Sequence, residues 1–154
     1  MPPGGSAPTV AAVELIAGDG EQAIDALAAA LAAAVPGATT AGIGRGLRQR
    51  EALGSTALGG GVALPHCRVS GLERSVVVVA RLRSGVDYGA PDGAPVRLFV
   101  AIATPAEQPG SHLRLLADLA RQLRDRGQVE RLLETDAVEE LATALLPGPT
   151  RRSA

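Results

Sequence analysis

The sequence contains no lysine and no tryptophan, and of the large aromatic residues it has only Tyr88 and Phe99. Sites that stack bases or sugar rings on aromatic side chains are therefore disfavoured. All 15 basic residues are arginines, and 16 acidic residues bring the net charge to -1. Because nucleic acid binding needs a basic face and these arginines are interleaved with acidic residues, we expect no nucleic acid partner.

Cysteine is also scarce, since Cys67 is the single one in the chain. A lone thiol excludes an internal disulfide and suits a reducing compartment. The longest apolar run, over residues 26–35, has about half of the roughly 20 residues that a bilayer crossing needs. No charged segment precedes an apolar stretch at the N-terminus, so no signal peptide is predicted. We expect a cytoplasmic protein that does not insert into a membrane.

The chain has 154 residues, 46% of them hydrophobic, which suits one compact domain. Residues 1–9 are rich in proline, glycine and serine and predict a disordered lead. Residues 147–154 predict a disordered tail. The folded domain is therefore expected over residues 10–146.

Strands and helices alternate along the predicted domain. Apolar segments bounded by turn residues predict strands at 10–17, 62–64, 75–82 and 96–103. Helical spacing predicts helices at 21–35, within 39–50, from Ser111 to a stop at Gly127, and from about residue 136. Asp19 and Ser111 are the predicted N-caps. The expected buried stripe of the third helix is Leu113, Leu116, Ala117, Ala120 and Leu123. This order predicts an α/β fold, a single-domain α/β/α sandwich with a mixed central sheet flanked by helices.

The chain has two histidines, His66 and His112, and both lie at predicted element boundaries. Pro65 cannot donate to a sheet, so His66 is expected at a strand end or in a loop. Reactive groups collect in such places, although an ordinary surface histidine is the alternative for each. His112 follows Ser111 in the first turn of a predicted helix. Unpaired backbone amides and the helix dipole attract anions such as a phosphoryl group there.

Four segments together resemble a known family. They are Arg50-Glu51, Ser55-Thr56, GVALPHCR over 61–68 and HLRLLADLA over 112–120. Their order and spacing are similar to those of enzyme IIA domains of the bacterial sugar phosphotransferase system. Within that system the chain resembles the fructose/mannitol class, which includes the nitrogen-regulatory phosphocarrier. The resemblance covers nearly the whole predicted domain.

The resemblance implies a phosphotransferase component in which His66 accepts a phosphoryl group from the histidine-containing phosphocarrier protein. Arg50 corresponds to the active-site arginine and His112 to the second active-site histidine. Supporting roles around the phosphate are implied for Thr56, Glu51 and Ser111. The next acceptor is implied to be the IIB domain of a sugar permease or a regulatory target protein.

The chemistry of these residue types agrees with this role. A neutral imidazole, with an ordinary pKa of about 6.5, keeps one unprotonated nitrogen as a nucleophile near neutral pH. The planar guanidinium of Arg50 suits recognition of phosphoryl oxygens. No metal or cofactor is expected, because Arg50, backbone amides and His112 can supply the charge that the transfer needs.

Other interpretations remain open at this point. Arg50 could form a surface ion pair with Glu51 or another neighbour. Cys67, beside His66, suggests thiol or zinc chemistry, although the chain lacks the four ligands of a structural zinc and neighbouring side chains on a strand point to opposite faces. A third possibility is a regulatory binding module whose partner binding depends on His66 phosphorylation, without sugar transport.

Overall fold

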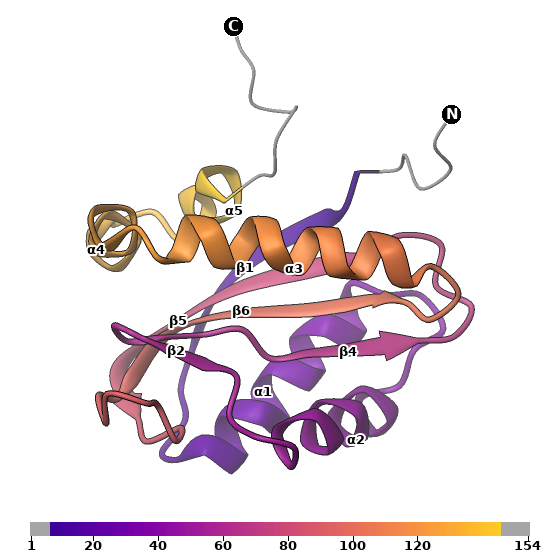
Figure 1. The fold of residues 1–154 in the computed structure, drawn as a ribbon, viewed down its shortest axis with the longest axis horizontal. Coiled ribbons are helices and arrows are strands. Elements are labelled where there is room, and N and C mark those ends of the chain that lie inside the picture. Colours follow the sequence, from indigo (N-terminus) through magenta and orange to yellow (C-terminus); the bar gives the residue numbers. More distant parts are fainter. Residues whose placement is uncertain (1–6, 146–154) are drawn as a thin grey trace, which may run out of the picture.

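A computed structural model describes residues 7–145 of the chain (Figure 1). Within that range the chain forms six strands and five helices in the order β1 (Thr9–Leu15), α1 (Gly20–Ala33), α2 (Thr40–Glu51), β2 (Ala57–Gly59), β3 (Val62–Ala63), β4 (His66–Val69), β5 (Val76–Val86), β6 (Val96–Pro105), α3 (Pro109–Leu123), α4 (Arg126–Glu134) and α5 (Glu139–Ala144). None of these helices has both the length and the apolar character that a bilayer crossing needs.

The strands form one mixed sheet in the order β1-β5-β6-β3-β2, with β4 also paired to β6. β1 runs parallel to β5, β5 antiparallel to β6, and β3 and β4 both parallel to β6. β3 and β4 share one register along β6, since Ala63 pairs with Phe99 and His66 with Ile102. Pro65 lies between them and contributes only its carbonyl, which accepts from Ile102 N at 2.9 Å. His66 is therefore at a strand end, as predicted.

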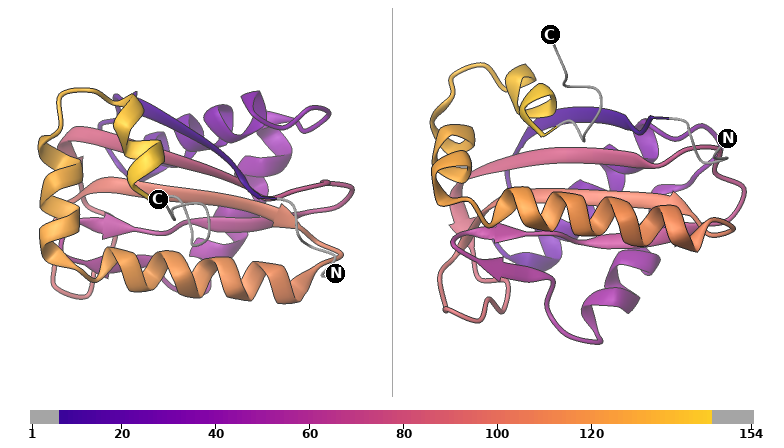
Figure 2. Two further views of the ribbon diagram at one scale, coloured as in Figure 1. Left: turned by 90° about the horizontal axis from the view of Figure 1, so that it is seen from above. Right: turned by 45° about the horizontal axis from the view of Figure 1, so that its top comes forward.

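Helices cover both faces of the sheet, with α1 and α2 on one side and α3, α4 and α5 on the other (Figures 1 and 2). The strand β6 shows the alternation expected of a central strand. Its residues Phe99, Ala101 and Ala103 belong to the core under α1 and α2. Leu98, Val100 and Ile102 belong to the core under α3, α4 and α5. The predicted α/β/α sandwich with a mixed sheet is confirmed.

Most predicted elements of the first two thirds of the chain are confirmed. Asp19 caps α1, and its carboxylate accepts from Gln22 N at 2.9 Å. Leu47 of α2 is fully buried, as expected for that helix. The four consecutive valines of β5 have at most 2% of their surface exposed, which fits a strand covered on both faces. β1 begins at Thr9, one residue before the predicted strand.

The prediction for the third helix was wrong in its start and its buried face. α3 begins at Pro109, and Gln108, not Ser111, occupies the N-cap position. Proline suits a first helical turn because its fixed φ is helical and its missing N–H needs no partner there. The buried residues of α3 are His112, Leu115, Leu119 and Leu123, and Leu113 is 63% exposed. Both leucine stripes have helical spacing, so the spacing could not choose between them.

The predicted helix stop at Gly127 was also wrong. α3 ends at Leu123, and Gly127 is the second residue of α4, a helix that the sequence did not reveal. Glycine lowers helix stability by only about 1 kcal/mol relative to alanine, so it does not by itself end a helix. Asp125 caps α4 by accepting from Gln128 N at 3.2 Å. Residues 1–6 and 146–154, which contain most of the predicted lead and tail, lie outside the described range.

Candidate functional site

His66 begins β4 and is half-buried, with both ring nitrogens engaged. Its Nδ1 lies 2.9 Å from the carbonyl oxygen of Leu64, and Arg50 Nε donates to its Nε2 at 3.2 Å. A carbonyl can only accept, so Nδ1 must carry the proton. A guanidinium can only donate, so Nε2 must present its lone pair. Two independent partners therefore specify the same neutral tautomer of His66.

Arg50 is the penultimate residue of α2, and the turn after that helix holds its side chain. The Nε of Arg50 donates to His66 Nε2, and its Nη1 donates to the carbonyl oxygen of Gly54 at 2.9 Å. Gly54 has a φ of +139, a conformation that side chains rarely adopt. The predicted alternative, an ion pair between Arg50 and Glu51, is absent from the ion pairs of residues 7–145. The guanidinium is thus directed at the imidazole.

Glu51 and Thr56 bind each other beside this pair. The Glu51 carboxylate accepts from both the backbone N of Thr56, at 3.0 Å, and its hydroxyl. Thr56 is buried and lines the same surface depression as His66 and Arg50. The carboxylate therefore ties the end of α2 to the start of β2 and shapes the loop around the site.

Tyr88 is a neighbour of this loop that no sequence pattern had selected. Its backbone carbonyl accepts from Ser55 Oγ at 2.5 Å. Its Oη is the one side-chain polar atom in the described range that is fully buried without a hydrogen-bond partner. Burial, and then the charge of Glu51, raise the pKa of Tyr88 above its usual value, so the phenol stays protonated.

His112 lies in the first turn of α3 and brings a second imidazole to His66. The two ring centroids are 5.5 Å apart, with planes tilted by 55°. His112 is only 4% exposed, and its Nδ1 lies 2.5 Å from Oγ1 of Thr104, a fully buried residue of β6. The structure thus brings Arg50, His66 and His112 together as the sequence predicted, and it adds Thr104.

Burial, and then the charges around them, favour the neutral form of both imidazoles. Burial lowers the pKa of His66, and the cations of Arg50 and Arg68 lower it further, against the opposing hydrogen bond to Leu64. Burial lowers the pKa of His112 to about 4, helped by His66 and Arg68. Near neutral pH the site therefore holds an uncharged nucleophilic nitrogen next to a permanent cation.

The site opens into a shallow depression of about 320 Å³. Its polar lining residues are Arg50, Ser55, Thr56 and His66. Its apolar lining comes from β2, from the link between β3 and β4 and from α3, through Ala57, Leu58, Leu64, Leu116, Ala117 and Ala120. Ser111, the third residue of α3, is half-buried and does not line this depression. A nucleophile and a cation inside an apolar rim can receive an anionic group carried by another protein.

Cys67 lies on the other side of the sheet from His66, in the core under α1 and α2. It is buried, and burial raises its pKa to about 11, so the reactive thiolate is disfavoured. No group of three or more His, Cys, Asp or Glu residues within 7–145 could hold a metal ion. The structure gives no support to thiol or zinc chemistry at this residue.

The fold and the site define a class of protein, and the comparison with protein families agrees. The chain belongs to the family described as phosphoenolpyruvate-dependent sugar phosphotransferase system, EIIA 2, whose model matches residues 9–146. Among curated proteins it is 36% identical to a nitrogen regulatory protein of Pseudomonas aeruginosa over 130 residues, 84% of each chain. It is 31% identical to the fructose-specific EIIA component of Haloferax volcanii over 99 residues, 64% of each chain.

Solved structures of relatives show the same fold. The nitrogen regulatory protein IIA-Ntr of Neisseria meningitidis superposes with a TM-score of 0.81 at 30% identity, covering 88% of this chain and 92% of that one. The mannitol IIA of Escherichia coli superposes with a TM-score of 0.70 at 26% identity, covering 88% and 94%.

Proposed function

We propose that this chain is a phosphocarrier in which Nε2 of His66 accepts a phosphoryl group from the histidine-containing phosphocarrier protein. The observation that carries the proposal is the neutral tautomer of His66, whose lone pair lies 3.2 Å from the guanidinium of Arg50. A nucleophilic lone pair facing a fixed cation is the arrangement that phosphoryl transfer between nitrogens needs. Membership of the EIIA family supports the same role.

The residues at the site account for each change of charge during the transfer. Nε2 of His66 forms a bond to phosphorus while the bond from phosphorus to the donor's ring nitrogen breaks, and that electron pair returns to the donor. The His66 ring gains positive charge, which the Nδ1–H bond to the Leu64 carbonyl stabilises. Arg50 releases Nε2 and binds the arriving phosphoryl oxygens. The transfer moves no proton and calls for no metal or cofactor.

Two onward acceptors are candidates, a IIB domain and a regulatory target protein. Two nitrogen regulatory relatives match 84% of the chain at 36% identity, whereas the fructose-specific component matches 64% at 31% and a 2-O-alpha-mannosyl-D-glycerate-specific EIIABC component matches 81% at 34%. These matches favour a regulatory role, in which partner binding depends on the phosphorylation of His66. The apolar rim formed by Leu64 and Leu116 offers such partners a surface next to the phosphoryl group.

The test is incubation of the protein with labelled phosphoenolpyruvate, the first enzyme of the phosphotransferase system and the histidine-containing phosphocarrier protein. We expect an acid-labile label on the wild type and on His112→Ala, at a lower rate in the variant. We expect none on His66→Ala, because the accepting nitrogen is gone. Label on His66→Ala at the wild-type level would contradict the proposal.

The same labelled protein separates the two acceptors. Incubation with an isolated IIB domain tests onward transfer, and loss of label to that domain favours sugar transport. Retention of label, together with a partner that binds only one of the two phosphorylation states, favours regulation. His66→Ala provides the unphosphorylated control in both measurements.

A further inference from the structure

Thr104 and His112 form an isolated buried pair next to the site. Thr104 is the penultimate residue of β6, opposite Arg68 of β4, and has no exposed surface. Its Oγ1 lies 2.5 Å from Nδ1 of His112, and this is the only hydrogen bond that either side chain makes within residues 7–145. No short sequence pattern links the two, since they belong to different elements and are eight positions apart.

The other nitrogen of His112 reaches the surface. Nε2 has no hydrogen-bond partner in the described part of the chain, and Tyr88 Oη is the one fully buried side-chain polar atom there that lacks a partner. Nε2 is therefore not fully buried. Because the two ring centroids are 5.5 Å apart, a group bound to His66 would lie next to the ring of His112.

The burial of the pair decides which partner donates. If Nδ1 donated to Thr104, the threonine O–H would be a buried donor without an acceptor, which is costly. If Thr104 donates to Nδ1, its proton is satisfied and the ring proton is on Nε2, where solvent can accept it. The second arrangement leaves no buried donor unpaired.

We propose that Thr104 is a positioning residue whose hydroxyl donates to Nδ1 of His112 and so keeps the ring proton on Nε2, ready to donate to a phosphoryl oxygen on His66. This inference rests on the proposed function. Phosphoryl oxygens only accept hydrogen bonds, so a ring with its lone pair at Nε2 would repel them. Because burial lowers the pKa of His112 to about 4, the ring is neutral at pH 7, and its tautomer decides whether it can donate. The charged or titratable groups facing it are His66 and Arg68, both from β4.

The first test needs no phosphoryl donor. Nitrogen-15 NMR of the unphosphorylated protein reports which ring nitrogen of His112 carries the proton. We expect Nε2 protonated and Nδ1 unprotonated in the wild type and in Thr104→Ser, which keeps the hydroxyl. Protonation at Nδ1 in the wild type would overturn the inference, whatever the labelling experiment shows.

The second test measures the rate of phosphoryl transfer to His66. We expect Thr104→Val to lower the maximal rate about tenfold with the KM for the donor unchanged, because the lost group orients a donor to the phosphoryl oxygens. Thr104→Ser should restore the rate, and Thr143→Val, an exposed threonine of α5, should leave it unchanged. A wild-type rate in Thr104→Val would overturn the inference.

A double variant shows whether Thr104 acts through His112. On the His112→Ala background, Thr104→Val should cause no further loss of rate, whereas independent effects would multiply and would contradict the inference. Thermal unfolding followed by circular dichroism identifies variants that do not fold. The NMR test uses the wild type, so it does not depend on these variants. If the wild type takes up no labelled phosphate but His112 is protonated at Nε2, the proposed function is refuted. The hydrogen bond from Thr104 to His112 would still be supported.

Discussion

Arg50 is expected to affect both the rate of phosphoryl transfer to His66 and the pKa of His66. Its Nε contacts His66 Nε2, and its charge contributes, after burial, to the lowered pKa of that ring. We expect Arg50→Ala to reduce the rate of His66 labelling about a hundredfold, as for loss of a preorganised donor. The pKa of His66 should rise, because a cation beside it is removed. Rapid-quench labelling and an NMR titration of His66 measure the two effects.

Arg48 supplies the matched control for Arg50. It lies two residues earlier on α2, and its guanidinium pairs with the exposed carboxylates of Glu21 and Asp25 on α1. Arg48→Ala should leave both the rate and the His66 titration unchanged. Equal effects of the two substitutions would show that Arg50 acts only through the stability of α2.

His112 should make the stability of the protein depend on pH in mildly acidic solution. Its folded pKa is about 4, below the ordinary value of 6.5. Above pH 6.5 the ring is neutral in both states and contributes nothing. Between pH 6.5 and 4 the imidazole binds a proton in the unfolded chain but stays neutral in the folded protein. The free energy of unfolding therefore decreases as the pH falls, by on the order of 3 kcal/mol.

Urea unfolding of the wild type and His112→Gln at several pH values between 7 and 4 measures this contribution. The glutamine variant does not titrate in this range, so its free energy of unfolding should decline less steeply. The other residues are common to both proteins, so the difference between the two curves reports mainly on His112. Parallel curves would contradict the lowered pKa of His112.

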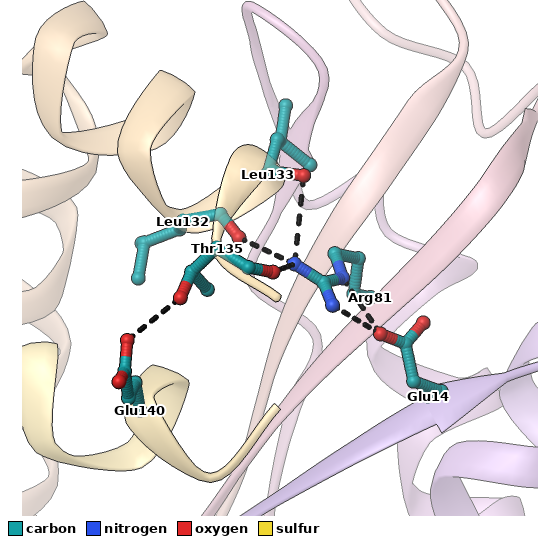
Figure 3. Close-up of polar contacts among 6 residues, drawn as sticks. All are labelled: Glu14, Arg81, Leu132, Leu133, Thr135 and Glu140. Atoms are coloured by element: carbon teal, nitrogen blue, oxygen red, sulfur yellow. Dashed lines mark hydrogen bonds and ion pairs between the residues drawn. The ribbon is translucent and has the colours of Figure 1, made fainter. Parts of the chain in front are cut away.

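At the scale of secondary-structure elements, a buried arginine joins the sheet to the helices at the end of the chain. Arg81 of β5 donates to the Glu14 carboxylate of β1 through Nε, at 2.8 Å, and through NH2 (Figure 3). Its Nη1 donates to the carbonyl of Leu132 at 3.0 Å and to that of Thr135 at 2.6 Å. A longer contact of 3.4 Å joins Nη1 to the carbonyl of Leu133. These carbonyls lie at the end of α4, where intrahelical donors are missing. Arg81 thus caps a helix that the sequence did not reveal.

We expect Arg81→Ala to lower the free energy of unfolding by about 3 kcal/mol, because it leaves buried and partly buried carbonyls unpaired and Glu14 without its cation. Arg48→Ala, which removes exposed ion pairs, should cost less than about 1 kcal/mol. Denaturant unfolding at pH 7 compares the two variants. An equal cost for both would show that the Arg81 contacts do not hold the end of α4 against the sheet.

At the scale of the whole molecule, the site forms where both helical layers reach the same sheet edge. Arg50 comes from the layer of α1 and α2, His112 comes from the layer of α3, and His66 lies between them on β4. The interruption of the edge strand at Pro65 places His66 at the start of a strand, with a carbonyl two residues earlier available to its Nδ1. An edge position leaves the ring half-buried and open to another protein.

Much of this arrangement could be predicted from the sequence, because it depends on local signals. Apolar runs and turn residues located the main strands and the first two helices. The resemblance to a known family selected Arg50, His66 and His112, and the structure places these three side chains next to one another. The prediction failed where local signals were ambiguous, since two leucine stripes in 111–123 have equal spacing and the short α4 has a glycine near its start.

The sequence by itself determined which residue types are present for phosphoryl chemistry and in what order they occur, because composition and spacing are properties of the chain alone. Only the tertiary structure decided the tautomer of His66, the pairing of Thr104 with His112 and the capping of α4 by Arg81. Each of these depends on hydrogen bonds that become possible once packing has removed water and brought separate segments within about 3 Å of one another.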